Sequence, residues 1–344
     1  MKVTIKDIAR ECAVSVGTVS GVLHEKDNVK EATKQKVLNA IRRLKYDPLQ
    51  NIPLARKVRT KTIGLVVPNV NYSAHPLVSR TFGCIKEVTS SYGYNCMFFS
   101  ESEIVRKTGE EFHQGSGSIP ADGLIVFCPG QNWDRYLRVL KKWGIPAVLV
   151  RRRTKVKGVS MISDDDREAM KLILDHLTGL GHTRIGYVEE GNSPQLKQRD
   201  QVYETYLKKA GLFWDTRLLF KNVLTSIFSD PREFINDYVK KLKPTAIICS
   251  ADRVAIEVIK ALKGHGIRVP EDMAITGHDN NPPAQLFSPG ITTVNMPVQE
   301  MCGMGVRILD DHFRGLNVET QDIKLKNELV VRESCGANVK DEDR

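Results

Sequence analysis

The chain has 344 residues, 41% of them hydrophobic, and a formal net charge of +10 at pH 7. This length predicts two or three domains with ample apolar material for buried cores. The first residues lack the apolar stretch of a signal peptide, and no apolar run approaches the roughly 18 residues that a membrane helix needs. The seven scattered cysteines form no CxxC pair, which argues against a disulfide framework or a zinc site and predicts a reducing cytoplasm.

The basic charge is concentrated at the start of the chain. Residues 1–62 hold 14 Lys or Arg and 6 Asp or Glu, so they contribute +8 and leave +2 for the other 282 residues. Such a surplus is typical of a segment that contacts nucleic-acid phosphates. The alternative is a solvated basic helix without a partner, which we weigh lower because a motif underlies the charge.

The motif is a helix-turn-helix pattern within residues 1–48. One short helix is expected from Thr4 and a second from Ser15, a good N-cap residue, with a tight connection between them. A third helix is expected over 30–44. The two first helices would share a small core made of Ile5, Ile8, Ala9, Val14, Val19, Val22 and Leu23. The second helix of such a motif enters the DNA major groove, so we expect a small all-α DNA-binding head.

Beyond a polar segment at 49–61, strands and helices alternate up to a charged tail at 339–344. This alternation predicts an α/β core with two doubly wound parallel-sheet subdomains, because the strands are too many for one sheet. Strands are expected over 62–67, 94–99, 122–127, 145–150, 184–188, 245–249, 273–277 and 328–332. Helices are expected over 77–91, 133–143, 166–180, 199–210, 232–241, 252–264 and 298–313.

The chain resembles the lactose/galactose repressor family of bacterial transcription regulators. The matching segments are 3–9 (VTIKDIA), 15–20 (SVGTVS), 63–68 (IGLVVP), 121–125 (ADGLI), 181–186 (GHTRIG), 266–272 (GIRVPED) and 330–334 (VVRES). The resemblance implies a core like periplasmic sugar-binding proteins, with one subdomain at 62–158 and 290–320 and the other at 159–289 and 321–338. It also implies a homodimer that binds a double-stranded DNA operator and a small-molecule effector, without a cofactor.

The resemblance also indicates which residues of the head read DNA. In the family the second helix presents its first turn to the base edges, which places Val16, Gly17 and Gly21 at the base-reading positions. The family usually has Arg in place of Gly21, and Arg reading guanine is the commonest specific contact, so few polar readers are expected. We expect four hydroxyl groups to bond phosphates, those of Thr4, Ser15, Thr18 and Ser20. For Thr18 and Ser20 the alternative is a role in helix capping or packing.

A hinge segment is the second DNA reader that the resemblance implies. In the family a short helix forms there on binding and wedges a leucine into the minor groove. The matching residues are Leu54, Ala55, Arg56, Lys57 and Val58, with Val58 at the wedge position. Valine is shorter and β-branched, so we expect a shallower wedge and a weaker helix. Pro53 either begins this helix or marks a disordered linker.

The effector cleft is expected at the carboxyl ends of the parallel strands. The residues that match ligand contacts of the family are Arg152, Arg199, Asp252 and Asp279, with a plain ion pair as the alternative for each. The family's aromatic pair is replaced by Leu77–Val78, and Tyr72 or Trp133 is the candidate substitute ring.

The charge of the effector is left open by the sequence. Arg151 stands where the family often has Asp, so the run 151–153 (RRR) favours an anionic ligand such as a carboxylate or phosphate. Neutralisation of that run by the acidic run 164–166 (DDD) is equally well supported and would allow a neutral sugar.

Together these features predict a cytoplasmic, homodimeric, effector-controlled transcription regulator, most simply a repressor. No phosphate-binding loop, dinucleotide-binding glycine motif, serine-hydrolase motif or zinc-protease motif occurs, and the histidines show no metal spacing, so neither catalytic nor metal-binding residues are expected. The alternative is a sugar-binding or sugar-modifying α/β protein with an incidental basic arm.

Overall fold

The computed structural model describes most of the chain, and every structural statement below refers to these residues: 4–23, 29–44, 46, 59–68, 76–108, 119–128, 130, 132–191, 193–221, 223, 227, 230–316 and 319–337. The chain divides into two compact units. Unit 1 consists of Met1–Asn69, Val88–Met161 and Gly305–Gln321, and unit 2 consists of Val70–Glu87, Ile162–Met304 and Asp322–Arg344.

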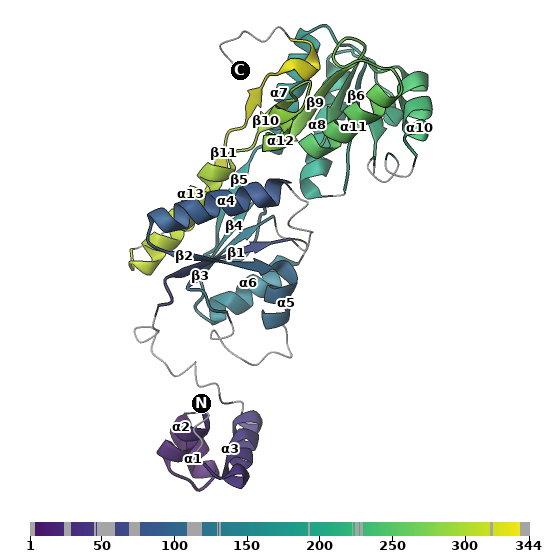
Figure 1. Ribbon diagram of the computed structural model, residues 1–344. Coiled ribbons are helices and arrows are strands. Elements are labelled where there is room, and N and C mark those ends of the chain that lie inside the picture. Colours follow the sequence, from purple (N-terminus) through teal and green to yellow (C-terminus); the bar gives the residue numbers. More distant parts are fainter. Residues whose placement is uncertain are drawn as a thin grey trace. The chain divides into compact units, whose positions relative to one another are not determined.

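Three short helices form the head: α1 (Ile5–Glu11), α2 (Val16–Leu23) and α3 (Glu31–Arg43) (Figure 1). Ala13 adopts a left-handed backbone, φ 50°, which makes the tight connection between α1 and α2. The buried apolar residues are Ile8, Ala9, Cys12, Val19, Val22, Val37, Ala40 and Tyr46, with Ile5, Val14 and Leu23 partly buried against them. The predicted helix-turn-helix and its small core are therefore confirmed.

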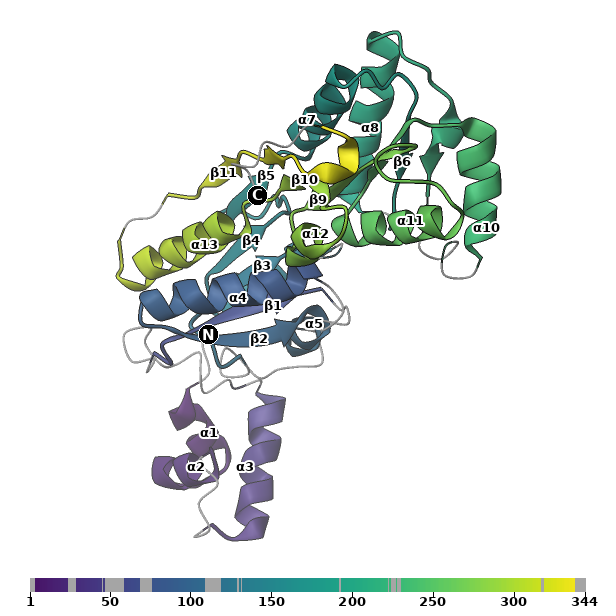
Figure 2. The same cartoon turned by 45° about the horizontal axis from the view of Figure 1, so that its top comes forward.

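The first six-stranded sheet has the order β11-β5-β4-β3-β1-β2. Its strands are β1 (Thr62–Val67), β2 (Asn95–Ser100), β3 (Gly123–Phe127), β4 (Ala147–Val150), β5 (Ser160–Asp164) and β11 (Asp322–Leu325). The pairs β1–β2, β1–β3 and β3–β4 are parallel. The helices beside this sheet are α4 (Pro76–Ser91), α5 (Glu101–Thr108), α6 (Trp133–Lys142) and α13 (Val298–Phe313), all labelled in Figure 1. Figure 2 shows α4, α5 and α13 from a second direction.

Alternating residues of β3 pack against helices on opposite faces of this sheet. Leu124 and Val126 belong to the same apolar cluster as Leu137 of α6. Gly123 lies against α13 so closely that a Cβ atom there would stand 2.9 Å from the ring of Phe313. A strand buried on both faces reads as a continuous apolar run, which explains why β1 and β3 were predictable from sequence.

The second six-stranded sheet has the order β12-β10-β9-β8-β6-β7. Its strands are β6 (Ile185–Val188), β7 (Leu219–Phe220), β8 (Ala246–Cys249), β9 (Ala274–Asp279), β10 (Thr292–Asn295) and β12 (Glu328–Val330). The pair β10–β12 is antiparallel, whereas β6–β7, β6–β8, β8–β9 and β9–β10 are parallel. The helices of unit 2 are α7 (Asp166–Gly179), α8 (Pro194–Lys209), α10 (Pro231–Glu233) with a π-helical continuation η6 (Phe234–Lys240), α11 (Asp252–Gly264) and α12 (Pro282–Leu286).

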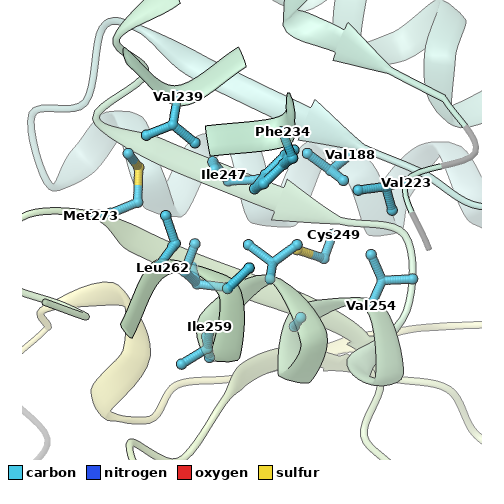
Figure 3. Close-up of a cluster of buried hydrophobic side chains, with 14 of the residues drawn as sticks. Val188, Val223, Phe234, Val239, Ile247, Cys249, Val254, Ile259, Leu262 and Met273 are labelled. Atoms are coloured by element: carbon cyan, nitrogen blue, oxygen red, sulfur yellow. The ribbon is translucent and has the colours of Figure 1, made fainter. Parts of the chain in front are cut away.

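This sheet also separates two apolar clusters. Figure 3 shows one of them, in which Ile247 and Cys249 of β8 meet Phe234 of η6 and Ile259 of α11. The neighbouring residues Ala246 and Ile248 of the same strand belong to the other cluster, together with Ile173 of α7 and Leu207 of α8. The predicted α/β core with two parallel-dominated sheets is therefore confirmed.

Four strands and two helices were not predicted: β5, β7, β10, β11, α5 and α12. All four strands are short, and β10 (TTVN) and β5 (SMISD) carry polar residues that hide the apolar pattern. The boundaries between the subdomains consequently differ from the expected ones. We expected the chain to change subdomain before 290, but β10 pairs with β9 and keeps Thr292–Asn295 in the second sheet.

Candidate functional site

The first helix of the head is fixed by its own N-terminus. The carboxylate of Asp7 accepts hydrogen bonds from the backbone nitrogen of Thr4 at 2.8 Å and from its hydroxyl at 2.6 Å, and these bonds lower the pKa of Asp7. The Thr4 hydroxyl is thus engaged in capping. Its predicted contact with a phosphate stays a prediction, and it requires the hydroxyl proton to turn away from Asp7, because a phosphate oxygen only accepts.

The second helix presents small and apolar groups at its start. Ser15 caps it by accepting from the backbone nitrogen of Thr18 at 3.0 Å, as its sequence position predicted. Val16 is 41% exposed although it is apolar, and Gly17 is also exposed. Gly21, by contrast, is buried, so at this position the helix offers no open surface, and Ser20 is half-buried. Of the three predicted base-reading positions, the structure therefore exposes Val16 and Gly17 and buries Gly21.

A polar hollow of about 370 Å³ lies beside the start of α2. It is lined by Ser15, Gly17, Thr18, Val29, Lys30 and Thr33. Three hydroxyl groups and one ammonium group around a hollow suit an anionic oxygen cluster such as a backbone phosphate. Lys30, which precedes α3 without capping it, thereby joins the candidate phosphate contacts.

The remaining predicted DNA contacts, Leu54, Ala55, Arg56 and Val58, lie outside the described residues, and so does Tyr72 among the predicted effector contacts.

A cluster of buried polar groups gathers around Arg199 in unit 2, where strands of the second sheet end. The guanidinium reaches Asp166 Oδ1 from Nε at 2.9 Å and from Nη2 at 2.6 Å, and Nη1 donates to the carbonyl of Ser250 at 3.1 Å. Nη2 also lies 2.5 Å from His278 Nε2. Arg199 is only 5% exposed, so its charge is held by protein groups on several sides.

The contact with Arg199 decides which tautomer His278 adopts. A guanidinium can only donate, so Nε2 of His278 must accept and the ring proton sits on Nδ1. Neither His278 nor Asp166 was predicted as a member of this cluster. In the sequence Asp166 belongs to an acidic run at the start of a helix, and His278 precedes Asp279. Neither residue is part of a motif that would indicate a contact with Arg199.

The cluster does not make a convincing metal site. Asp164, Asp166 and His278 offer ligand atoms within 4.8 Å of one another. The guanidinium of Arg199 already contacts two of these three residues, and a bound cation would face that positive charge at close range. The chemistry of the donor set therefore fits an arginine and a polar ligand better than a metal ion.

Asp252 and Asp279 lie next to each other and differ in role. Asp252 is buried: Oδ2 accepts from the backbone nitrogen of Asn281 at 2.7 Å and Oδ1 from the hydroxyl of Thr293 at 2.6 Å. Burial, with the nearby charge of Asp279, raises the pKa of Asp252 to about 8. Because both of its carboxylate oxygens are engaged, Asp252 holds the segment after β9 in place. This geometry gives no support to the predicted contact of Asp252 with the effector.

Asp279 ends β9 in a left-handed backbone, φ 101°. Its carbonyl oxygen accepts from Nη1 of Arg80 at 2.6 Å, and its carboxylate lies 3.4 Å from the side-chain nitrogen of Asn281. A left-handed conformation outside glycine is strained, and such strain is common at binding sites. Asp279 thus stays a candidate ligand contact.

The basic run at 151–153 belongs to unit 1. Arg151 is buried with a left-handed backbone, φ 59°, and Arg152 is half-buried. The proposed neutralising run has other partners, because Asp165 pairs with Lys324 at 2.5 Å and Asp166 pairs with Arg199. Two of the three carboxylates therefore serve unit 2 itself.

Comparison with known proteins decides the family. Residues 4–49 match the profile of bacterial regulatory proteins of the lacI family, and residues 174–335 match that of periplasmic binding protein-like domains. The transcriptional regulator RegA of Clostridium acetobutylicum is 31% identical over 97% of this chain and 100% of its own. The chain belongs to the LacI family of bacterial transcription regulators.

Further relatives agree with this assignment. The transcriptional repressor PurR of Photobacterium profundum is 28% identical over 96% of this chain and 98% of its own. The solved complex of the transcriptional regulator CelR with cellobiose superposes with a TM-score of 0.67 at 26% identity, covering 97% of this chain and 100% of CelR. The predicted function, a DNA-binding regulator with an effector-binding domain, is thereby confirmed at the level of the family.

The LacI-family head offers a direct test of its base-reading turn. A Cβ atom at Gly17 would meet only Ser15 Oγ, at 3.6 Å, so a larger side chain fits there. Gly17→Gln should add a preference for adenine of about 1–3 kcal/mol, because a glutamine amide pairs with the adenine edge. Selection of binding sites from random DNA measures the preference. Gly17→Ala is the control, since it shares the gain in helix propensity and lacks the amide; equal site preferences in both variants would exclude position 17 from base reading.

A buried carboxylate at the end of β6 generates a prediction on pH. Glu189 is 1% exposed and shares Lys221, at 2.9 Å, with Asp200. Burial, assisted by Asp200, raises the pKa of Glu189 to about 7 despite Lys221. The folded state thus holds this proton more tightly than the unfolded chain, and the resulting stability is complete below pH 4.5 and lost as pH rises through 7.

Glu189→Gln should remove this loss. Between pH 5 and 8 the unfolding free energy of the wild type should fall by on the order of 2–3 kcal/mol relative to the variant. Urea unfolding across this range is the measurement. Glu190→Gln, one residue along, should keep the wild-type dependence, and parallel curves for wild type and Glu189→Gln would contradict the assignment.

Proposed function

We propose that this LacI-family protein is a homodimeric repressor whose effector binds at the Arg199 cluster and Asp279 of unit 2. The observation that carries the proposal is the gathering of buried polar groups from α7, α8, β8 and β9 at the carboxyl ends of parallel strands, where ligands bind in open α/β sheets. Effector binding would act by shifting the population between conformations with different operator affinity.

The charge balance of the cluster favours a neutral, polyhydroxylated effector. Asp166 neutralises Arg199 at hydrogen-bond distance, so the arginine does not need an anion from the ligand. A site built from both hydrogen-bond donors and acceptors, here a guanidinium and carboxylates, suits sugar hydroxyl groups, which both donate and accept. The relative CelR was solved with cellobiose, in keeping with this class. Arg151 and Arg152 remain the residues that would favour an anionic effector.

The partners follow from the family. The head would bind a double-stranded operator as one of a pair, because one head reads only a half-site. None of the described helices is both long and apolar enough to cross a bilayer. We infer that the protein works in the cytoplasm and acts by binding rather than catalysis.

The effector site is tested by thermal unfolding with a panel of neutral sugars and sugar phosphates. A ligand that binds only the folded state stabilises it by about 2.7 kcal/mol at 100 times its Kd, so a neutral sugar should raise the Tm. Asp279→Asn keeps the shape but loses the carboxylate, and the shift should vanish. Asp272→Asn is the control, since Asp272 pairs with Arg268 on the surface. A panel in which only phosphates raise the Tm would contradict the sugar assignment, and an unaltered shift in Asp279→Asn would remove that residue from the site.

The edge of the first sheet supports the proposed homodimer. Strand β2 ends the strand order and exposes two large apolar side chains, Met97 at 38% and Phe98 at 43%. An exposed apolar edge strand is costly unless another surface covers it. Phe98→Glu should therefore convert the dimer to monomers in sedimentation analysis and weaken operator binding, whereas Leu180→Glu, an equally exposed site in unit 2, should leave the dimer intact. A dimeric Phe98→Glu variant would exclude this edge as the interface.

A further inference from the structure

A cavity of about 390 Å³ opens in unit 1, whereas the Arg199 cluster belongs to unit 2. Its walls come from the last turn of α6, the start of β4, the segment that enters β5 and the last turns of α13. Its volume lies within the range of about 300–1,000 Å³ that small-molecule sites occupy. Nothing in the proposed effector or DNA contacts uses it.

The lining of the cavity combines an apolar interior with polar groups. Leu137, Val148, Ile308 and Leu309 are buried and supply the apolar wall. Lys141 supplies an ammonium group and His312 an imidazole, while Ser160 and Thr320 add hydroxyl groups. The Nζ atom of Lys141 donates to the carbonyl of Lys157 at 2.7 Å, which uses one of its three donors and directs the amine to this place.

The surroundings of the cavity are strongly basic. Residues 134–157 contain nine Lys or Arg and a single Asp, although the whole core from 63 onward carries only +2. The loop after β4 runs along α6, because Thr154 bonds Asp134 at 2.5 Å and Lys141 bonds the carbonyl of Lys157. Lys142 and Lys157 therefore lie near Lys141 and the cavity, whereas the run 151–153 follows the other end of β4 and Arg151 is buried. Two acidic residues, Asp310 and Asp311, precede His312 in α13. Asp310 pairs with Arg314 at 2.8 Å.

We propose that this cavity is a second ligand site, which binds a small molecule with an apolar body and one anionic group. The apolar wall takes the body, and Lys141 pairs with the carboxylate, sulfonate or phosphate at the cavity's edge. The positive surface raises the local concentration of anions and favours this class over neutral or cationic ligands. The proposal does not depend on which effector binds unit 2.

The position of the cavity along the chain gives such a ligand a regulatory role. Ser160 begins β5 and Ile308 lies in α13, and the division between the two units falls within both of these elements; Thr320 lies two residues before β11. A ligand bound here contacts β5 and α13, which both connect unit 1 with unit 2. Its binding is therefore coupled to any change in those connections, and by linkage the effector affects its affinity in turn.

Fluorescence titration of the full-length protein tests the site with a matched pair of probes. 1-Anilinonaphthalene-8-sulfonate carries an apolar body with one sulfonate, and N-phenyl-1-naphthylamine is the same framework without the charge. The sulfonate should bind saturably. Lys141→Gln should weaken it about tenfold, the effect of losing a charge-assisted hydrogen bond, and should leave the neutral probe unchanged. Lys141→Arg should restore most of the affinity.

Two further variants decide where the probe sits. Lys142→Gln makes the same charge change one residue along, outside the cavity, and should alter sulfonate binding less than about twofold. Ala147→Leu fills the cavity and should abolish saturable binding of both probes, with its Tm showing that it is folded. Equal weakening of sulfonate binding by Lys141→Gln and Lys142→Gln would overturn the proposed site. Saturable binding of the probes to folded Ala147→Leu with wild-type affinity would also overturn it.

Discussion

Arg199 joins four elements of unit 2 at the point where their ends meet. From α8 it reaches Asp166 at the start of α7, the carbonyl of Ser250 after β8, and His278 in β9. Burying two charges costs several kcal/mol of desolvation free energy, so the pair itself adds little net stability. Removing one partner costs about 3–5 kcal/mol, because the other charge is left buried without a partner. The arrangement fixes the strand ends at which an effector would bind.

The two functions of the chain draw on different physical interactions. The predicted base-reading positions of the head, Val16 and Gly17, offer no hydrogen-bonding side chain, so we expect phosphate contacts to supply most of its affinity for DNA. Unit 2 relies on short-range geometry, with charges neutralised before a ligand arrives. In the proposed homodimer, pairing two heads would multiply this weak readout of bases, so dimerisation would contribute to specificity as much as any single side chain.

Sequence predicted what depends on local patterns. The helix-turn-helix, the buried strands β1 and β3 and the capping Ser15 were visible because each has a periodicity or a turn signature of its own. Short polar strands such as β10 form only because a neighbouring strand pairs with them. The predicted subdomain boundary near residue 290 was wrong for the same reason, since β10 pairs with β9. Arg199 and Asp279 were predicted as effector contacts by resemblance, whereas Asp166 and His278 join the Arg199 cluster only through contacts between residues far apart in the chain. Gly21 was placed on the DNA-reading surface by resemblance, yet packing within the head buries it.

The central claim is that a ligand at the Arg199 cluster and DNA at the head influence each other through one protein. Thermodynamic linkage makes this measurable without knowing the conformations involved, since each ligand must change the affinity of the other by the same factor. The decisive measurement is isothermal titration of the effector into the protein with and without saturating operator DNA, beside an operator titration with and without effector. We predict equal factors of about 5–150 in the two experiments. Effector affinity that is identical with and without operator would contradict the account.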